Sequence, residues 1–564
     1  MNRLTQKTYP DNSTVIYTYD NASRLTQVSD PTGTYQFTFD NMGRLTAATT
    51  QYTFLTGRNF TAGYSYDAAS NRTGFTDPEN GATSYVYDTL NRLQTLTLPA
   101  AFSGTGNFGF SYDALSRRTQ LTRPNSVTTT YGYDTLSRLL NVTHKKGTTT
   151  LDGATYTVDS AGNHLSRTPQ PSGTASNYGY DAIYELTGVT QGHSTTESYT
   201  YDAVGNRLSA FHSSGWTYNS SNELTSRPSF TYTYDNDGNT LTKVSGSSTT
   251  TYAWDFENRL SSVTLPGSGG TVSFKYDPFG RRIYKSSSGG TSVFAYDGDN
   301  LIEETNSSGT VVARYAQGLN IDEPFAMLRS GVTSYHEADG LGSVTSLTNS
   351  SGSIANTYTY DSFGNLTASS GTLTNSFRYT ARESDTETGL YYYRARYYDP
   401  STGRFVSEDP LGPRNSDVPS DLFEYVTNSP VNFVDPRGLY VLDKHQKVPP
   451  FPPSGPIILL LICTEKYLGE QLIVTSTSEH SERAHHFANT PHGRGEAVDV
   501  GYPKNPSKLL CCAAQCEAGT ARDEKVDPSK HSTGDHIHLG LFPDTKRGRG
   551  DLPPPCKTRD CNQY

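Results

Sequence analysis

The stretch Tyr17-Thr-Tyr19-Asp20-Asn-Ala-Ser-Arg24-Leu25 contains the pattern that decides the fold. Alternating aromatic residues predict a strand, the Asp-x-x-x-Arg segment predicts a turn, and the apolar residue after it begins a return strand. The commonest spacing between copies is roughly 20–25 residues, which is typical of stacked repeats. A single hairpin is marginally stable, so we expect each one to pack on its neighbours. The pattern returns at Phe37-Thr-Phe39-Asp40, Tyr85-Val-Tyr87-Asp88, Tyr131-Gly-Tyr133-Asp134, Tyr199-Thr-Tyr201-Asp202, Tyr232-Thr-Tyr234-Asp235, Phe274-Lys-Tyr276-Asp277 and Tyr358-Thr-Tyr360-Asp361.

The composition agrees with a mostly β chain. Charged residues make up 18% of the 564 residues and aromatic residues 12%, with 40 Tyr and 23 Phe, whereas a disordered chain has few aromatic residues. The net charge of -10 argues against nucleic acid as a partner. No apolar segment approaches the ~20 residues of a membrane span. The N-terminal residues Met1-Asn-Arg-Leu have no apolar signal segment after them.

These motifs closely resemble the YD repeats of Rhs proteins and of the insecticidal-toxin C proteins. The resemblance covers roughly residues 1–440 and includes two further signatures, Gly389-Leu-Tyr-Tyr-Tyr-Arg-Ala-Arg-Tyr-Tyr398-Asp-Pro-Ser-Thr-Gly403-Arg-Phe and Asn428-Ser-Pro430-Val-Asn-Phe-Val-Asp435-Pro-Arg-Gly438-Leu439. It implies a spiral β-sheet that closes into a hollow shell around a variable C-terminal domain. We therefore predict a YD-repeat array over 1–378, an Rhs core and boundary motif over 379–439, a proline-rich linker over 440–456 and a small α+β domain over 457–564.

The resemblance also implies self-cleavage after Leu439, because family members cut themselves there with paired aspartates. Two carboxylates that share a proton can activate water. Asp409 and Asp421 lie upstream of Leu439 and are the candidates, although both could be ordinary turn residues. Glu408 precedes Asp409, where better-known members have Arg.

The residues after the boundary differ in composition from the repeats. Prolines at 449, 450, 452, 453 and 456 predict an extended spacer. The six cysteines of the chain all follow this spacer, which predicts disulfides and an oxidising destination. Reduced thiols, or a second metal site that uses some of them, are the alternatives. The cysteines are Cys463, Cys511, Cys512, Cys516, Cys556 and Cys561.

Two segments of this tail predict a zinc site. His492 and Asp499 lie on either side of two glycines that permit a tight turn, and His536-Ile-His538-Leu is strand-like. Two strands of one sheet could bring His492, Asp499 and His538 around one ion, with a fourth position left for water. The alternative is that these histidines are ordinary surface residues. The pattern resembles the zinc peptidases that include D-alanyl-D-alanine carboxypeptidases and L-alanyl-D-glutamate endopeptidases. That resemblance implies Asp535 as the general base, with His536 as its competitor.

The leading hypothesis is an Rhs-type toxin whose C-terminal domain is a zinc-dependent peptidase that hydrolyses peptidoglycan peptide bonds. A disulfide-bearing domain suits a secreted or cell-surface protein that acts in the periplasm or cell wall. The toxin resemblance implies an immunity protein, and secretion or delivery machinery is a further expected partner. A structural or adhesive repeat protein with an inactive tail is the alternative from another class. A wall-remodelling enzyme on a repeat stalk is the third.

Overall fold

The computed structural model describes residues 3–102, 106–412 and 421–439 with their side chains, and the backbone of five short strands beyond them. Apart from two single turns of 3-10 helix, η1 (Tyr379–Ala381) and η2 (Val426–Asn428), every regular element in these residues is a β-strand. The prediction of a mostly β chain is therefore confirmed. No helix among the described residues is long and apolar enough to cross a membrane.

Most strands belong to two long antiparallel sheets in which each strand pairs with the next one along the chain, one of 20 strands and one of 16. The first sheet contains β1 (Gln6–Thr8), β2 (Thr14–Tyr19), β3 (Leu25–Asp30), β4 (Gly33–Phe39), β5 (Leu45–Tyr52), β6 (Asn59–Tyr66), β7 (Arg72–Thr76), β8 (Ala82–Tyr87), β9 (Leu93–Thr97), β10 (Phe108–Tyr112), β11 (Arg118–Thr122), β12 (Val127–Tyr133), β13 (Leu139–Lys146), β14 (Thr149–Val158), β15 (His164–Pro169), β16 (Ser176–Tyr180), β17 (Leu186–Gln191), β18 (Ser194–Tyr201), β19 (Arg207–Ala210) and β20 (Ser213–Ser214). The second contains β21 (Thr217–Tyr218), β22 (Leu224–Arg227), β23 (Phe230–Tyr234), β24 (Thr240–Ser245), β25 (Ser248–Trp254), β26 (Leu260–Thr264), β27 (Thr271–Tyr276), β28 (Arg282–Ser287), β29 (Gly290–Asp297), β30 (Asn300–Thr305), β31 (Val311–Gln317), β32 (Pro324–Arg329), β33 (Val332–Ala338), β34 (Val344–Asn349), β35 (Ile354–Tyr360) and β36 (Leu366–Ser370).

Three small sheets follow. The first is a four-stranded meander of β37 (Glu383–Asp385), β38 (Leu390–Tyr393), β39 (Arg396–Asp399) and β40 (Arg404–Phe405). The second pairs β41 (Phe433–Val434) with β42 (Leu442–Asp443). The third has the order β43 (Val474–Ser476), β44 (Ala497–Gly501), β46 (His536–Gly540), β45 (Thr520–Glu524).

In repeats such as that of Asp40, an Asp and the Arg four residues after it build the turn between the two strands. Asp40 Oδ1 accepts the backbone N–H groups of Met42 and Arg44, each at 2.9 Å. Arg44 Nε donates to Asp40 Oδ2 at 2.6 Å, and Gly43 between them has a φ of 81°. Arg44 Nη1 also donates to the backbone oxygen of Asp67 in the next repeat at 2.8 Å. The same Asp–Arg pair therefore closes one turn and ties it to the next.

The two tyrosines of each repeat have different roles. Tyr85, the first of its pair, is 5% exposed and packs in the core between sheet layers. Tyr87, the second, donates its hydroxyl to the backbone oxygen of Arg72 in the preceding repeat at 2.9 Å. Equivalent bonds join Tyr66 to Leu45, Tyr112 to Leu93, Tyr201 to Leu186, Tyr276 to Leu260 and Tyr360 to Val344. The repeat tyrosines thus form core and cross-strand contacts.

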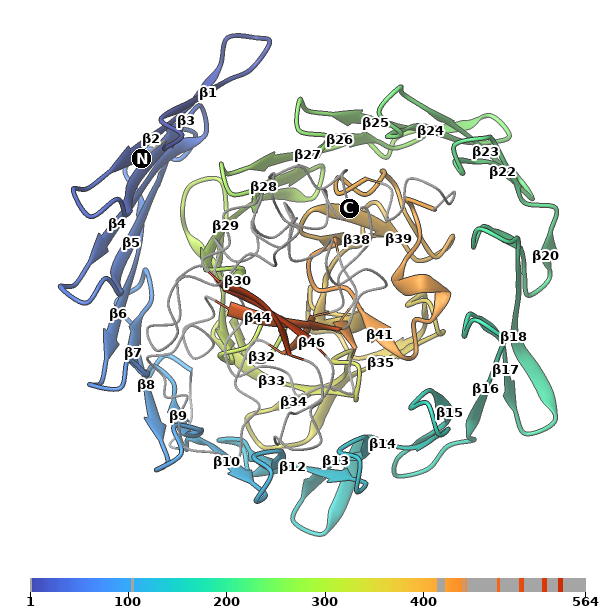
Figure 1. Ribbon diagram of the computed structural model, residues 1–564, viewed down its shortest axis with the longest axis horizontal. Helices are drawn as coiled ribbons and strands as arrows, with labels where there is room; N and C mark the ends of the chain where they lie inside the picture. Colours follow the sequence, from blue (N-terminus) through green and yellow to red (C-terminus); the bar gives the residue numbers. More distant parts are fainter. Residues whose placement is uncertain are drawn as a thin grey trace.

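The two long sheets form an inward spiral. Figure 1 shows an outer ring that runs from β2 through β26 and an inner turn from β29 to β35 that lies within it. Contacts between the outer and inner turns join residues that are far apart in the sequence. The sequence separation is 242 residues for the contact of Tyr52 with Phe294 and 165 residues for that of Glu197 with Ser362. The separation decreases because the spiral tightens towards its centre.

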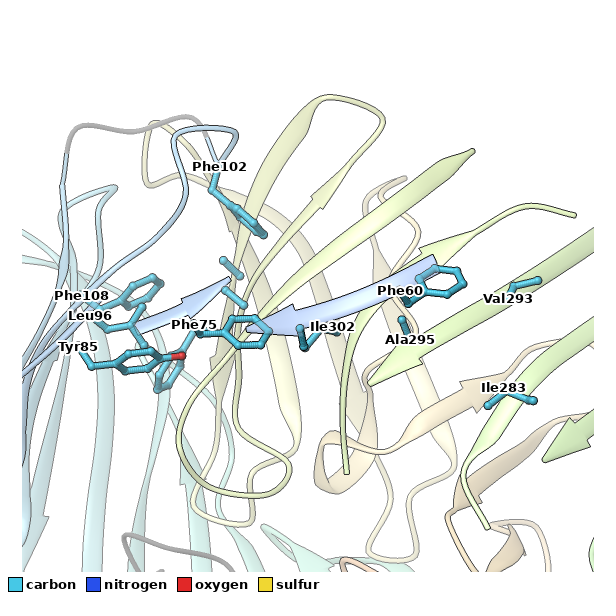
Figure 2. Packing of buried hydrophobic residues seen from close by; sticks show 14 of the residues in the cluster. Phe60, Phe75, Tyr85, Leu96, Phe102, Phe108, Ile283, Val293, Ala295 and Ile302 are labelled. Carbon is cyan, nitrogen blue, oxygen red and sulfur yellow. The ribbon is translucent and has the colours of Figure 1, made fainter. Parts of the chain in front are cut away.

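An apolar core fills the space between the outer and inner turns (Figure 2). Phe60, Phe75 and Phe108 of the outer turn belong to one cluster with Val293 and Ile302 of the inner turn. Each of the five is less than a tenth exposed. Burial of apolar surface at about 25 cal/mol per Å² makes this layer the main stabilising contact of the spiral.

A buried ionic cluster also joins the two turns. Glu337 on β33 is fully buried and lies 2.8 Å from Arg123 and 3.0 Å from His144, both on the outer turn. Thr348 Oγ1 donates to its second carboxyl oxygen at 3.0 Å. A buried carboxylate with these partners is stable only while each of them is present.

Replacing Glu337 with Gln is expected to destabilise the shell by about 3–5 kcal/mol, because it leaves the Arg123 charge buried without its counter-charge. The measurement is the denaturant midpoint of the full chain followed by tyrosine fluorescence. Glu257→Gln is the matched control, since Glu257 pairs with Lys7 across the same spiral but is only partly buried, with an exposed partner. It should cost less than about 1 kcal/mol. Equal losses in the two variants would contradict the assignment.

Candidate functional site

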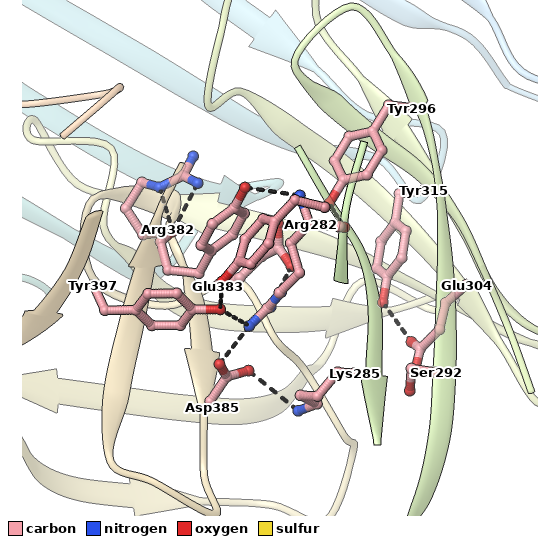
Figure 3. A network of polar contacts seen from close by, with 12 residues as sticks. Arg282, Lys285, Ser292, Tyr296, Glu304, Tyr315, Arg382, Glu383, Asp385 and Tyr397 are labelled. Carbon is pink, nitrogen blue, oxygen red and sulfur yellow. Dashed lines mark hydrogen bonds and ion pairs between the residues drawn. The ribbon is translucent and has the colours of Figure 1, made fainter. Parts of the chain in front are cut away.

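The sheet β37–β40 is held against the inner turn by a buried polar network (Figure 3). Arg282 on β28 lies 2.8 Å from Glu383 and also pairs with Asp385, while Lys285 reaches Asp385 at 3.2 Å. The hydroxyl of Tyr392 accepts the backbone N–H of Arg282 at 2.8 Å. The network orients the hairpin β38–β39, which carries the next set of contacts.

The boundary segment 435–439 lies along this hairpin. The backbone N–H of Ala395 donates to the oxygen of Arg437 at 3.1 Å, and Arg396 Nε donates to the oxygen of Gly438 at 2.5 Å. Gly438 has a φ of 70°, and a Cβ there would lie 2.6 Å from the backbone oxygen of Tyr393. Only glycine therefore permits this close approach of two backbones.

Two aspartates converge on Arg396 beside Leu439. Arg396 Nη2 lies 3.1 Å from Asp409 Oδ2 and 3.8 Å from Asp435 Oδ2. Asp435 Oδ1 accepts the backbone N–H groups of Arg437 at 3.2 Å and Leu439 at 3.1 Å. Leu439 itself is 9% exposed. The carboxyl pair therefore lies at the last described residue before the Leu439–Tyr440 bond.

Asp409 and Asp435 lie in different electrostatic environments. Burial raises the pKa of Asp435 to about 6, and the charge of Asp409 adds to that rise, while Arg396 and the Leu439 N–H oppose it. Arg396 lies closer to Asp409, so it stabilises negative charge there more strongly. Acid–base hydrolysis by a pair of aspartates needs two carboxyl groups whose environments differ in this way.

Asp421 occupies a different environment. Its Oδ1 accepts Arg404 Nη2 at 2.8 Å and the backbone N–H of Phe423 at 2.9 Å. The geometry therefore favours Asp435 over Asp421 as the partner of Asp409. Sequence reasoning missed both Asp435 and Arg396, although Asp435 lies inside the boundary motif only four residues before Leu439.

We propose self-cleavage at this carboxyl pair and expect it to be faster at pH 6 than at pH 8, because the acid form of Asp435 is populated below its pKa of about 6. Above that pH the rate should fall by about tenfold per unit. The raised pKa also means that the folded chain holds a proton that the unfolded chain releases, so this stabilising contribution is lost as pH rises through 6. The measurement is the cleavage rate of freshly refolded chain from pH 6 to pH 8, followed by gel densitometry. It tests whether the rate falls as pH rises. A rate that rises towards pH 8 would contradict it.

The structure describes part of the predicted zinc site. The predicted strands around Asp499 and His538 are confirmed as β44 and β46, which pair antiparallel. Asp499 is the direct register partner of His538, and His536 is that of Gly501. Directly opposed residues of an antiparallel pair lie on one face of the sheet. A carboxylate and an imidazole are both donors that suit zinc.

The remaining elements of that prediction lie outside the described residues. The same holds for the predicted linker 440–456 apart from β42, and for most of 457–564, including His492, Asp535 and the six cysteines. Among the residues with described side chains, no group of three or more His, Cys, Asp or Glu is arranged to hold a metal ion.

Comparisons with known proteins agree with this architecture. The family described as Teneurin YD-shell matches residues 163–431, and the RHS repeat family matches residues 2–35 and 112–149. The crystal structure of TcdB2-TccC3-Cdc42 superposes with a TM-score of 0.64 at 20% identity, over 77% of this chain and 27% of that one. The fold is a YD-repeat shell.

Curated relatives share parts of the sequence. The tRNA3(Ser)-specific nuclease WapA of Bacillus spizizenii is 30% identical over 261 residues, which are 44% of this chain and 11% of the relative. The double-stranded DNA deaminase toxin A of Burkholderia cenocepacia is 25% identical over 291 residues, or 44% and 20%. The chain thus spans only about a tenth to a fifth of the length of these relatives.

Proposed function

We propose that this chain is an Rhs-type toxin sequence, a YD-repeat shell that cuts itself after Leu439 and so frees the region that follows. The observation that carries the proposal is the convergence of Asp409 and Asp435 on Arg396 beside Leu439. The relatives named as a nuclease and a deaminase toxin support the toxin class.

In the proposed reaction the ionised Asp409 takes a proton from a water molecule. The hydroxyl oxygen bonds to the carbonyl carbon of Leu439 while the acid form of Asp435 donates its proton to the departing Tyr440 nitrogen. The C–N bond breaks and leaves an amine on Tyr440 and a carboxylic acid on Leu439. The new acid passes its proton to the ionised Asp435 and becomes a carboxylate, and Asp409 releases its proton to solvent, so both aspartates return to their starting states. Arg396, which binds the neighbouring Gly438 oxygen, orients the peptide and balances the charge.

We further propose that the released region is a zinc-dependent peptidase that acts on peptidoglycan. Its support is the direct register of Asp499 with His538. The proposal takes His492 as the third ligand. Zinc held there would supply a Lewis acid and an acidified water. Asp535 would take the proton of that water and return it to the leaving amine, a role for which His536 competes.

A second candidate follows from the relatives. WapA is named as a tRNA nuclease and the Burkholderia protein as a DNA deaminase, so a nucleic-acid enzyme in the same position is the rival activity. Incubation of the self-cleaved chain with purified peptidoglycan, and separately with tRNA and double-stranded DNA, discriminates between them by mass analysis of the products.

Delivery and protection are part of the proposal. Chains of Tc toxin structures superpose on this shell, including the Photorhabdus luminescens holotoxin pore with a TM-score of 0.63. We infer a secreted or surface-delivered protein that acts in the periplasm or cell wall of a target cell, with delivery machinery and an immunity protein as partners.

Replacing Asp535 with Asn is expected to reduce peptide-bond hydrolysis by about 10²–10⁴-fold while zinc stays bound, because a general base is removed but no ligand. The readouts are peptidoglycan fragment release and zinc content of the same preparation. His536→Ala is the comparison and should cost less. An active Asp535→Asn chain beside an inactive, zinc-loaded His536→Ala chain would reverse the two roles.

A further inference from the structure

Two arginines beside the cleavage site reach outward to the inner turn of the shell. Arg437 Nη2 lies 2.6 Å from Asp299 Oδ2, in the turn between β29 and β30. Arg394, at the tip of the β38–β39 hairpin, donates from Nη2 to Asp322 Oδ1 at 2.7 Å and from Nη1 to Asp322 Oδ2 at 3.2 Å. Asp322 lies in the loop between β31 and β32. The boundary motif is thus anchored on two separate loops of the inner turn.

The same two arginines also hold the backbone of the boundary segment. Arg394 Nη1 donates to the oxygen of Pro436, and Arg394 Nη2 donates to the backbone oxygen of Asp299 at 3.2 Å. Arg437 is two residues from Asp435 and two from Leu439, and its oxygen accepts the Ala395 N–H. A shift of the Arg437 or Arg394 side chain therefore displaces the backbone of residues 436–439, which Asp435 and Arg396 contact.

The charges keep these anchors in place at neutral pH. Burial alone would raise the pKa of Asp299, but Arg437, Arg394 and Arg281 together lower it below its usual value. Asp322 also pairs with Arg382, which is 2% exposed and donates to the backbone of Tyr392. Both aspartates thus connect strands of the spiral with strands of the cleavage site.

We propose that Asp299 and Asp322 are positioning residues that make self-cleavage depend on the closed inner turn of the shell. The inference rests on the proposed self-cleavage. Until β29–β32 dock against the hairpin β38–β39, Arg437 and Arg394 lack the carboxylates that orient them, and the Leu439 peptide is not held against Asp409 and Asp435. Cutting therefore follows closure of the inner turn.

The test uses the full chain, refolded and followed by intact mass for the fragment that ends at Leu439. Asp299→Asn and Asp322→Asn are expected to slow cleavage by roughly 10- to 100-fold, as a displacement of about 1 Å does elsewhere. Asp299→Glu, which keeps the charge, should recover most of the rate. Arg437→Gln combined with Asp299→Asn should be no slower than the slower single variant.

Asp297→Asn is the matched control. Asp297 lies two residues before Asp299 but pairs with Arg72 of the outer turn at 2.6 Å. This variant should lose thermal stability and still cleave at the wild-type rate below its melting temperature. If Asp299→Asn cleaves like wild type while Asp435→Asn stays intact, the positioning proposal is overturned and the self-cleavage proposal survives. A wild-type chain that stays intact overturns both.

Discussion

An Asp435→Asn chain is expected to remain a single species of full-length mass after prolonged incubation under native conditions. The amide occupies nearly the same volume, and its oxygen can still accept the neighbouring N–H groups, but it has no acidic proton to transfer to the leaving nitrogen. Loss of a general acid costs about 10²–10⁴-fold in rate. Wild-type chain should meanwhile yield a fragment that ends at Leu439, identified by mass spectrometry.

Asp421→Asn is the control for this experiment, because Asp421 is also buried and also paired with an arginine. It should reduce stability and leave cleavage in place. Cleavage that stops in Asp421→Asn and continues in Asp435→Asn would restore the pair Asp409 and Asp421 that sequence reasoning favoured.

The second large effect concerns zinc. Asp499→Ala and His538→Ala, each in the full chain, are expected to lose stoichiometric zinc, since a tetrahedral site with only two protein ligands binds the metal far more weakly. Metal analysis after dialysis is the measurement. Asp523→Ala is the control, because Asp523 is the register partner of Ile537 and lies on the opposite face of the sheet from His538. Undiminished zinc in His538→Ala would refute the ligand set.

Local sequence patterns predicted the hairpins because the causes of each hairpin are local. Asp88, for example, accepts the N–H groups of Leu90 and Arg92 within its own turn. A pattern of five residues therefore contains all the information that the turn needs. The alternating aromatic residues beside it likewise indicated which face of the strand is buried.

The contacts between turns of the spiral could not be predicted in the same way. Nothing near Tyr52 in the sequence indicates that its hydroxyl meets the backbone of Phe294, 242 residues later. The proposed cleavage site could not be predicted for the same reason, since Arg396, Asp409 and Asp435 come from separate segments that meet only in the folded chain. By contrast, the sequence could predict that Asp499 and His538 lie on neighbouring strands, because each lies on a strand with a clear two-residue alternation.

The inward spiral also has a kinetic consequence. As the chain emerges from the ribosome, the outer turn is completed before any of its inner partners exist, because those partners lie 165–242 residues further on. Its apolar face, with Phe60, Phe75 and Phe108, must wait for Val293 and Ile302. Contacts of such long range fold slowly and leave apolar surface exposed to aggregation. Slow elongation through β28–β33 should therefore lower the yield of soluble shell more than slow elongation through β1–β6.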